Sequence, residues 1–186
     1  MRSLTAIALV LGSLLTARAF AADEEDPLAS GRWTSYAYGS WTAAGGEHLN
    51  EVHVGLGRFL VDGLSVSLET VGGLLDFGRK AGPTAQTWAA GLDLVARWHP
   101  LRAAMGSLYV DAGTGLRLFG SPFPVGGTRF DFALRAGVGG TAYLARNVSL
   151  EAGVGWFHIS NAALWGIARN PGHNAAWFQG GLLVLW

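Results

Sequence analysis

The sequence has no cysteine and a single lysine, Lys80, and charged residues make up only 14% of its 186 positions. Without thiols, the chain can form neither disulfides nor a thiolate metal site. Half of the residues are hydrophobic, yet beyond the first 21 positions no apolar run reaches the length of about 20 residues that a transmembrane helix needs. Such a chain either buries a large core or meets lipid through strands.

Residues 1–21 have the pattern of a secretory signal peptide. Arg2 precedes an apolar run over 4–15, and small residues at Ala19 and Ala21 flank a larger one, as a signal peptidase site requires. We predict cleavage after Ala21, with 17–19 as the less favoured site. A retained anchor is the alternative, and the shortness of the apolar run disfavours it.

Cleavage would leave a chain of one-domain length with little net charge. The signal peptide removes Arg2 and Arg18 from the 13 basic residues, so 11 remain against 13 acidic residues, a net charge of −2. A nucleic-acid partner would require a basic face, and this balance argues against one.

From Gly31 onward, apolar and polar residues alternate with a period of two, and glycines occur where they would break a helix. Eight strand-length segments are predicted, joined by short connections at 60–63, 99–105 and 145–147 and by generally longer ones at 43–47, 76–84, 120–128 and 160–173. The segments are 31–42, 48–60, 63–75, 85–98, 107–119, 129–142, 147–159 and 174–186. Short turns alternating with longer loops are typical of outer-membrane barrels.

The two faces of these segments differ in polarity. Trp88, Leu92 and Trp98 share one face of their segment, whereas Asp93 and Arg97 lie on the other with glycine and alanine. A soluble barrel such as a lipocalin would place the apolar face inside. Small residues beside the charges, tryptophans at both ends of one strand and a terminal strand ending in an aromatic residue favour lipid outside instead.

We therefore predict an all-β fold, an eight-stranded antiparallel transmembrane β-barrel over 31–186, preceded by a short segment at 22–30. The charges of the polar face should form an interior network. They are Glu69, Asp93, Arg97, Asp111, Arg117, Asp131, Arg135 and Glu151.

One constellation near the C-terminus has the residue types of a hydrolase. His158 and Ser160 are two residues apart at a strand end, so their side chains project to the same face. A histidine near a serine can act as the general base for its hydroxyl, and asparagine or backbone amides can stabilise an oxyanion. His-x-Ser alone is a common pattern, and a polar strand end explains it equally well.

The run His158-Ile-Ser-Asn-Ala, followed by Asn170-Pro-Gly, resembles the lipid A 3-O-deacylases (the PagL family). The resemblance is sharp from Gly155 to Asn174 and architectural elsewhere. It implies an outer-membrane esterase that removes the ester-linked 3-hydroxy fatty acid at position 3 of lipid A without a metal or cofactor. It also implies His158 as general base, Ser160 as nucleophile, and Asn161 and Asn170 as oxyanion or supporting residues.

Two positions depart from the family pattern. Ala163 stands where the characterised enzyme has glycine, which would alter the backbone amides of an oxyanion hole. Asn174 stands where the acidic triad member is expected. It can accept a hydrogen bond from the imidazole but cannot balance its positive charge. Glu151, the nearest acid in sequence, falls on the opposite face of its strand, so an impaired enzyme remains one interpretation.

The alternation also places the constellation. His158 and Ser160 share a face with Val154 and Trp156, so they should face lipid at the outer leaflet, where polar groups are costly without a purpose. Lipid A is then the expected substrate, and outer-membrane lipid is expected to surround the barrel. A homodimer is a further possible partner state.

The remaining candidates have more general interpretations. His48, His53 and His99 lack metal-ligand spacing, and structural or interfacial roles are expected for them. His173 either approaches the site or, as the favoured interpretation, is a solvated loop residue. Arg79, Lys80 and Arg169 either meet lipid A phosphates or are solvated loop charges. Two rival functions remain: a non-catalytic structural or adhesive barrel that has lost the acid, and a barrel acyltransferase with an interior acyl pocket, against which the charged interior argues.

Overall fold

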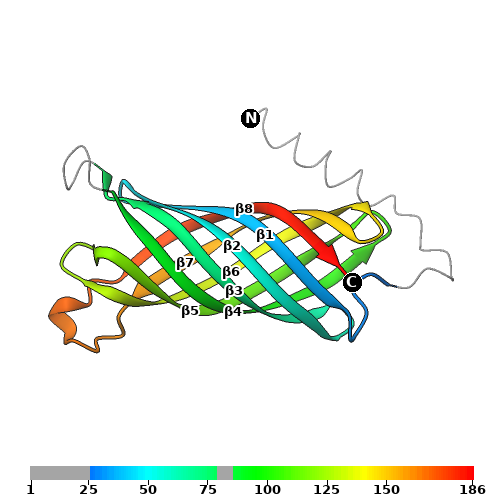
Figure 1. The fold of residues 1–186 in the computed structure, drawn as a ribbon, viewed down its shortest axis with the longest axis horizontal. Helices are drawn as coiled ribbons and strands as arrows, with labels where there is room; N and C mark the ends of the chain where they lie inside the picture. The colour runs from blue at the N-terminus through cyan, green and yellow to red at the C-terminus, as the bar shows by residue number, and fades with distance from the viewer. Residues whose placement is uncertain (1–25, 79–85) are drawn as a thin grey trace.

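The computed structural model describes residues 26–78 and 86–186; the predicted signal peptide and the loop residues Arg79 and Lys80 lie outside the described residues. Eight antiparallel strands form a closed barrel, as predicted, in which each strand pairs with its neighbours in the sequence and the last pairs with the first (Figure 1). The strands are β1 (Trp33–Ala44), β2 (Glu47–Val61), β3 (Leu64–Asp76), β4 (Gln86–Ala103), β5 (Gly106–Phe123), β6 (Thr128–Ala145), β7 (Val148–Ser160) and β8 (His173–Leu185). No helix among these residues is long and apolar enough to cross a membrane.

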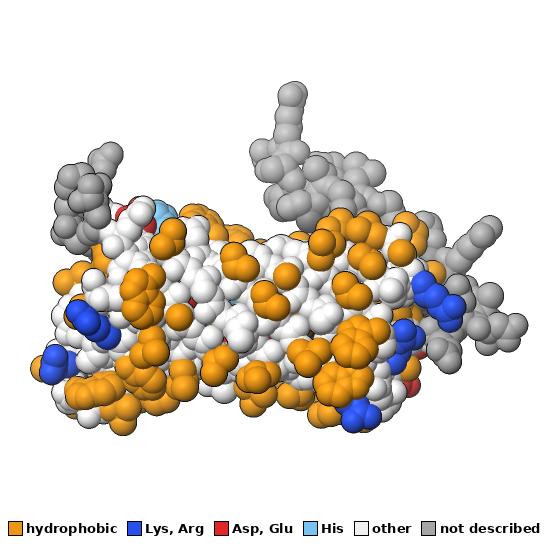
Figure 2. Space-filling view, in the orientation of Figure 1, with side chains coloured by type: hydrophobic (Ala, Val, Ile, Leu, Met, Phe, Trp, Pro, Cys, Tyr) orange, Lys and Arg blue, Asp and Glu red, His pale blue; other side chains and the backbone are white. Residues whose placement is uncertain are grey.

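The apolar face of the strands points outward and the polar face inward, as predicted. Trp88 and Trp98 are about half exposed on the wall, whereas Asp93 and Arg97 are buried inside. Hydrophobic side chains are spread over the visible wall, and arginine side chains gather at its two ends (Figure 2). A soluble barrel with an apolar interior is therefore the wrong alternative.

Glycines on the inward face make room for the charged side chains. A Cβ atom on Gly115 would overlap the Asp93 carboxylate, and one on Gly91 would lie within 2.7 Å of Arg117 Nη1. A barrel of eight strands has an interior just wide enough for side chains. The alternation of glycine with charge is therefore a packing requirement of this narrow interior.

Three connections are tighter than predicted. Only Gly45 and Gly46 join β1 to β2, because both have a positive φ, the conformation that a two-residue hairpin turn requires. The predicted connection at 99–105 is mostly strand, since β4 continues past a register shift after Trp98. The predicted loop at 120–128 reduces to four residues, because β5 extends to Phe123, whose ring is buried against Phe119.

The two ends of the barrel differ. The first described residues and the end of β8 lie at one end of the barrel, called the turn end here. Leu28 is buried at this end, and Trp33 stacks on Trp186 with ring centroids 6.0 Å apart. The opposite end, called the loop end here, carries the segment 161–172 with its short helix η2 (Ile167–Arg169), coloured orange in Figure 1.

Candidate active site

His158 and Ser160 lie on the outward face of β7 at the loop end. Both are partly exposed, whereas Phe157 and Ile159 beside them point into the barrel and are buried. β7 ends at Ser160 because Ala162 and Ala163 have left-handed φ values of 52° and 58°, which a strand cannot accommodate. Both side chains therefore lie on the apolar outer wall at the end of β7, directly before the loop begins.

Asn174 lies opposite His158 on the neighbouring strand β8. Its Oδ1 atom is 3.0 Å from Nδ1 of His158 and 3.0 Å from the indole Nε1 of Trp156. The rings of Trp156 and His158 stack with centroids 5.7 Å apart and planes 15° from parallel. Three outward side chains from two strands therefore form one bonded cluster.

Ser160 is on the same face but is not directly bonded to the histidine. Within residues 26–78 and 86–186, no hydrogen bond joins the Ser160 hydroxyl to the imidazole. Bonds between a base and a nucleophile are often long without substrate and tighten in the reacting complex. Ser160 pairs across the sheet with Phe132 of β6.

Asn161 organises the loop that follows Ser160. The residue is 1% exposed. Its amide nitrogen donates to Thr128 Oγ1 at 3.1 Å and to the Arg169 carbonyl at 2.6 Å, while its Oδ1 accepts from the Ala163 amide at 3.0 Å. Because both amide hydrogens are engaged, this side chain supports the loop, and any oxyanion donor comes more readily from the loop backbone.

Asn170 completes the arrangement. Its Oδ1 atom accepts a 2.9 Å hydrogen bond from the backbone amide of Asn161. The loop residue Gly172 lies against the histidine, since a Cβ atom on it would be 3.6 Å from His158 Cε1. The sequence-predicted residues His158, Ser160, Asn161, Asn170 and Asn174 are thus brought to one region of the loop end, with different partners.

The left-handed backbone at Ala163 gives a testable expectation. A non-glycine residue in this conformation costs about 1–2 kcal/mol, so Ala163→Gly should raise the free energy of unfolding by up to about 1 kcal/mol after the entropic cost of glycine. Urea unfolding of the purified barrel measures the change. Ala168→Gly in the same loop is the matched control, because Ala168 is not among the positive-φ residues, and it should lower stability. Equal effects of the two changes would contradict strain at Ala163.

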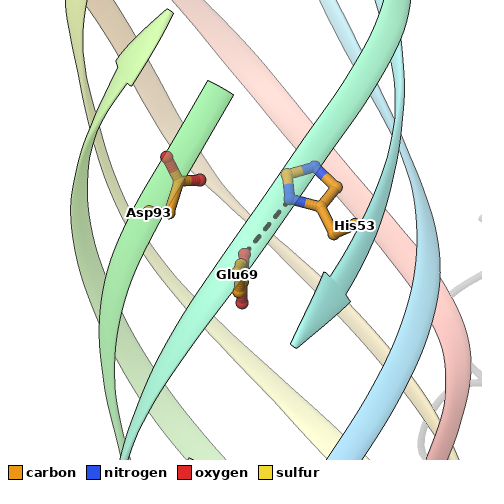
Figure 3. Close-up of side chains that lie close together, drawn as sticks. All are labelled: His53, Glu69 and Asp93. Carbon is orange, nitrogen blue, oxygen red and sulfur yellow. Dashed lines mark hydrogen bonds and ion pairs between the residues drawn. The ribbon is translucent and has the colours of Figure 1, made fainter. Parts of the chain in front are cut away.

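A second polar cluster lies inside the barrel and was not predicted as a unit. His53, Glu69 and Asp93 offer ligand atoms within 4.8 Å of one another (Figure 3). Each comes from a different strand, so spacing along the sequence could not reveal the cluster. The Glu69 carboxylate already has partners. It accepts from Arg135 Nη2 at 2.6 Å and from the hydroxyls of Tyr36 and Tyr38 at 2.8 Å, and it lies 3.1 Å from His53 Nδ1.

Arg135 also approaches Asp93, with 3.7 Å between Nη1 and Oδ2. A metal ion at this cluster would have to displace a guanidinium group from two carboxylates. We therefore assign His53, Glu69 and Asp93 to the interior charge network.

The predicted interior network is present. Arg117 pairs with Asp93, Arg97 with Asp111 and Glu151, and Arg135 with Glu69. Glu51, which also pairs with Arg117, was missed by sequence reasoning, although its alternation with the exposed Val52 and Val54 could have indicated it. Asp131 is buried, and its Oδ1 atom accepts from Thr128 Oγ1 at 3.5 Å; within the described residues no ion pair joins it to the network.

The other histidines have structural surroundings. His173 is the first residue of β8 and is partly buried, with its Nδ1 atom 3.2 Å from Glu47, so the prediction of a solvated loop residue was wrong. The cause is the early start of β8. His48 stacks on Trp41, and His99 bonds Ser107 inside the barrel at 2.7 Å. Arg169 is exposed in the loop.

Solved structures with the same architecture are outer-membrane barrels. Neisserial surface protein A (NspA) matches with a TM-score of 0.53 and 13% identity, covering 82% of this chain and 95% of its own. The outer membrane protein OprG from Pseudomonas aeruginosa matches with a TM-score of 0.52 and 10% identity, covering 87% and 99%. At such identities the likeness shows the fold alone, a closed eight-stranded barrel like those of these two outer-membrane proteins.

The sequence identifies the family within this class. The profile of the lipid A 3-O-deacylase (PagL) family matches residues 29–182, nearly the whole described barrel. The chain belongs to that family, which confirms the resemblance seen around His158. Among curated protein sequences no significant match is found.

Proposed function

We propose that this protein is a serine esterase that removes the ester-linked 3-hydroxyacyl chain from position 3 of lipid A. The observation that carries the proposal is the position of Ser160 beside a bonded His158–Asn174 pair on an otherwise apolar outward face. Polar side chains on a lipid-facing surface cost free energy, so their presence there indicates a functional site. Membership of the lipid A 3-O-deacylase family supplies the substrate class.

His158 would activate Ser160. With its Nδ1 hydrogen donated to Asn174, the imidazole has a free lone pair on Nε2, which accepts the hydroxyl proton. The serine oxygen attacks the ester carbonyl carbon, and the tetrahedral intermediate collapses as the bond to the sugar oxygen breaks. His158 returns the proton to that oxygen. Water then hydrolyses the acyl-serine by the same steps, which releases the 3-hydroxy fatty acid and restores Ser160.

The proposed oxyanion donor is the backbone amide of Ala162, in the sharp turn that the left-handed residues Ala162 and Ala163 form after Ser160. The amides of Asn161 and Ala163 on either side of it already donate to the Asn170 and Asn161 side chains. Asn161 and Asn170 hold that turn through their side chains. In this proposal they support the oxyanion site, and Ser160 and His158 perform the chemistry.

An apolar groove on the wall suits the acyl chain of the substrate. It measures about 570 Å³ and starts beside Trp156, on the turn-end side of His158; Ala136, Val138, Val154, Gly155, Ala176 and Phe178 are among its lining residues. If the loop end faces the cell exterior, the ester group of lipid A meets Ser160 at the outer leaflet. Its acyl chain then lies along the groove, toward the turn end. The interior suits an acyl chain far less, since the cavity beside Arg97 and His99 measures about 10 Å³.

Mass spectrometry of lipid A tests the proposal. Lipid A from cells that express the protein should contain a species lighter by one ester-linked 3-hydroxyacyl group, absent from cells with the empty vector. Unchanged lipid A masses, with the folded barrel present in the outer membrane, would contradict it.

The second candidate function is a non-catalytic structural or adhesive barrel, and Asn174 in place of an acid is the observation that favours it. Asn174→Glu separates the two. If the protein is an esterase, a carboxylate that balances the imidazolium should raise the deacylation rate by about tenfold or more. Time-resolved lipid A analysis measures this rate. A wild type and a variant that both leave lipid A unchanged would support the non-catalytic barrel.

A further inference from the structure

Trp156 contacts both members of the His158–Asn174 pair. Its indole nitrogen lies 3.0 Å from Asn174 Oδ1, and its ring stacks on the imidazole. Trp156 and His158 are two residues apart on β7, and Asn174 faces them from β8, so the strand geometry itself brings the three together. The reaction proposed above assigns no role to Trp156.

The hydrogen-bonding capacity of the three groups fixes their orientation. An indole N–H can only donate, so the Asn174 atom that faces it must be the carbonyl oxygen. The same oxygen faces His158 Nδ1 and can only accept, so Nδ1 must carry the hydrogen. Without the indole, the asparagine amide could rotate by 180° and donate to Nδ1, which would move the imidazole hydrogen to Nε2.

The position of that hydrogen decides whether His158 can act as a base toward Ser160. The Nδ1–H form leaves Nε2 free to accept the hydroxyl proton, whereas the Nε2–H form blocks it. A carboxylate in the third position needs no such help, since both of its oxygens accept. An asparagine has one accepting and one donating end, and therefore needs a neighbour to select between them.

We propose that Trp156 is a positioning residue that allows the uncharged Asn174 to serve in place of the acid of a catalytic triad. By locking the amide of Asn174 with a donor-only N–H group, it holds His158 in the Nδ1–H form that the esterase mechanism requires. This inference rests on the proposed function for its purpose, but the hydrogen position itself can be measured without any activity.

The ring nitrogens of His158 report that position directly. In the ¹⁵N-labelled wild-type barrel in detergent micelles, nuclear magnetic resonance should show His158 in the Nδ1–H form at neutral or mildly alkaline pH. Trp156→Phe retains an aromatic ring but removes the N–H, and it should give a mixture of both forms. Trp98→Phe, a similarly exposed tryptophan on β4, is the matched control and should leave His158 unchanged.

A second background separates positioning from a general structural role. In wild type, Trp156→Phe should lower the deacylation rate by about fivefold, as expected when one neutral hydrogen bond no longer biases two forms. In an Asn174→Asp background, the same change should alter neither the imidazole form nor the rate by more than about twofold, because a carboxylate has no donating end. An equal loss of rate in both backgrounds would overturn the proposal.

The inference and the proposed function can fail separately. If wild type does not deacylate lipid A, the function fails, and the imidazole spectra alone decide the inference. An Nε2–H form in wild type, or an unmixed Nδ1–H form in folded Trp156→Phe, would overturn the role of Trp156 even if the protein proves to be an active esterase.

Discussion

Ser160→Ala is expected to reduce release of 3-hydroxy fatty acid from lipid A by about a thousandfold or more, because it removes the atom that attacks the ester. His158 would then have no hydroxyl to deprotonate, and the loop backbone would have no tetrahedral intermediate to stabilise. The fold should survive, since Ser160 is partly exposed at a strand end and its hydroxyl makes no hydrogen bond with the described residues. Lipid A mass spectrometry and free fatty acid analysis measure the loss.

The control must separate chemistry from misfolding. Ser121→Ala changes a partly exposed serine on β5 near the same end of the barrel, and it should leave the reaction rate unchanged. Heat-modifiable migration on gels shows whether each variant is folded. A folded Ser160→Ala barrel that still deacylates lipid A at the wild-type rate would exclude Ser160 as the nucleophile.

The alternation of side chains explains why so much of the fold could be predicted. A strand repeats every two residues, so polarity alone separates the outward Trp98 from the inward Arg97. Strand ends were harder, because they depend on the interior. β5 reaches Phe123 through a register shift and the burial of that ring, and neither leaves a period-two pattern in the sequence.

The candidate site could be predicted in part for the same reason. His158 and Ser160 are two residues apart in one motif, so the period of two in a strand assigns both side chains to the same face. The bond to Asn174 was expected from the resemblance, and the register of β7 with β8 provides it. Trp156 was predicted only as a residue of the apolar face. Its indole contact depends on side-chain conformations that no spacing rule specifies.

The interior was predicted as a set of charges but without its pairs. Arg117 illustrates the reason, because its partners Glu51 and Asp93 come from β2 and β4, far from it in sequence. Inward parity shows that the three side chains share one space. Only the stagger of the closed barrel decides which carboxylate meets which guanidinium.

Arg117→Ala is expected to destabilise the barrel by about 3–5 kcal/mol, the range for breaking a buried ion pair by removing one partner. The Arg117 guanidinium is fully buried; its Nε atom lies 2.7 Å from Glu51 Oε1 and its Nη2 atom 2.9 Å from Asp93 Oδ2. Its removal leaves two carboxylates in the narrow interior without their main cation. Urea unfolding of the barrel in detergent or lipid vesicles measures the change in free energy.

Two further variants show whether the cause is uncompensated charge. Arg102→Ala removes an arginine whose pair with Asp26 is about one-third exposed, and should cost about 1 kcal/mol or less. Arg117→Met combined with Glu51→Gln and Asp93→Asn removes the orphaned charges together with the arginine, and should recover much of the lost stability. If the triple variant is as unstable as Arg117→Ala, the loss comes from the missing volume of the side chain, and the interior charges matter less than their close packing suggests.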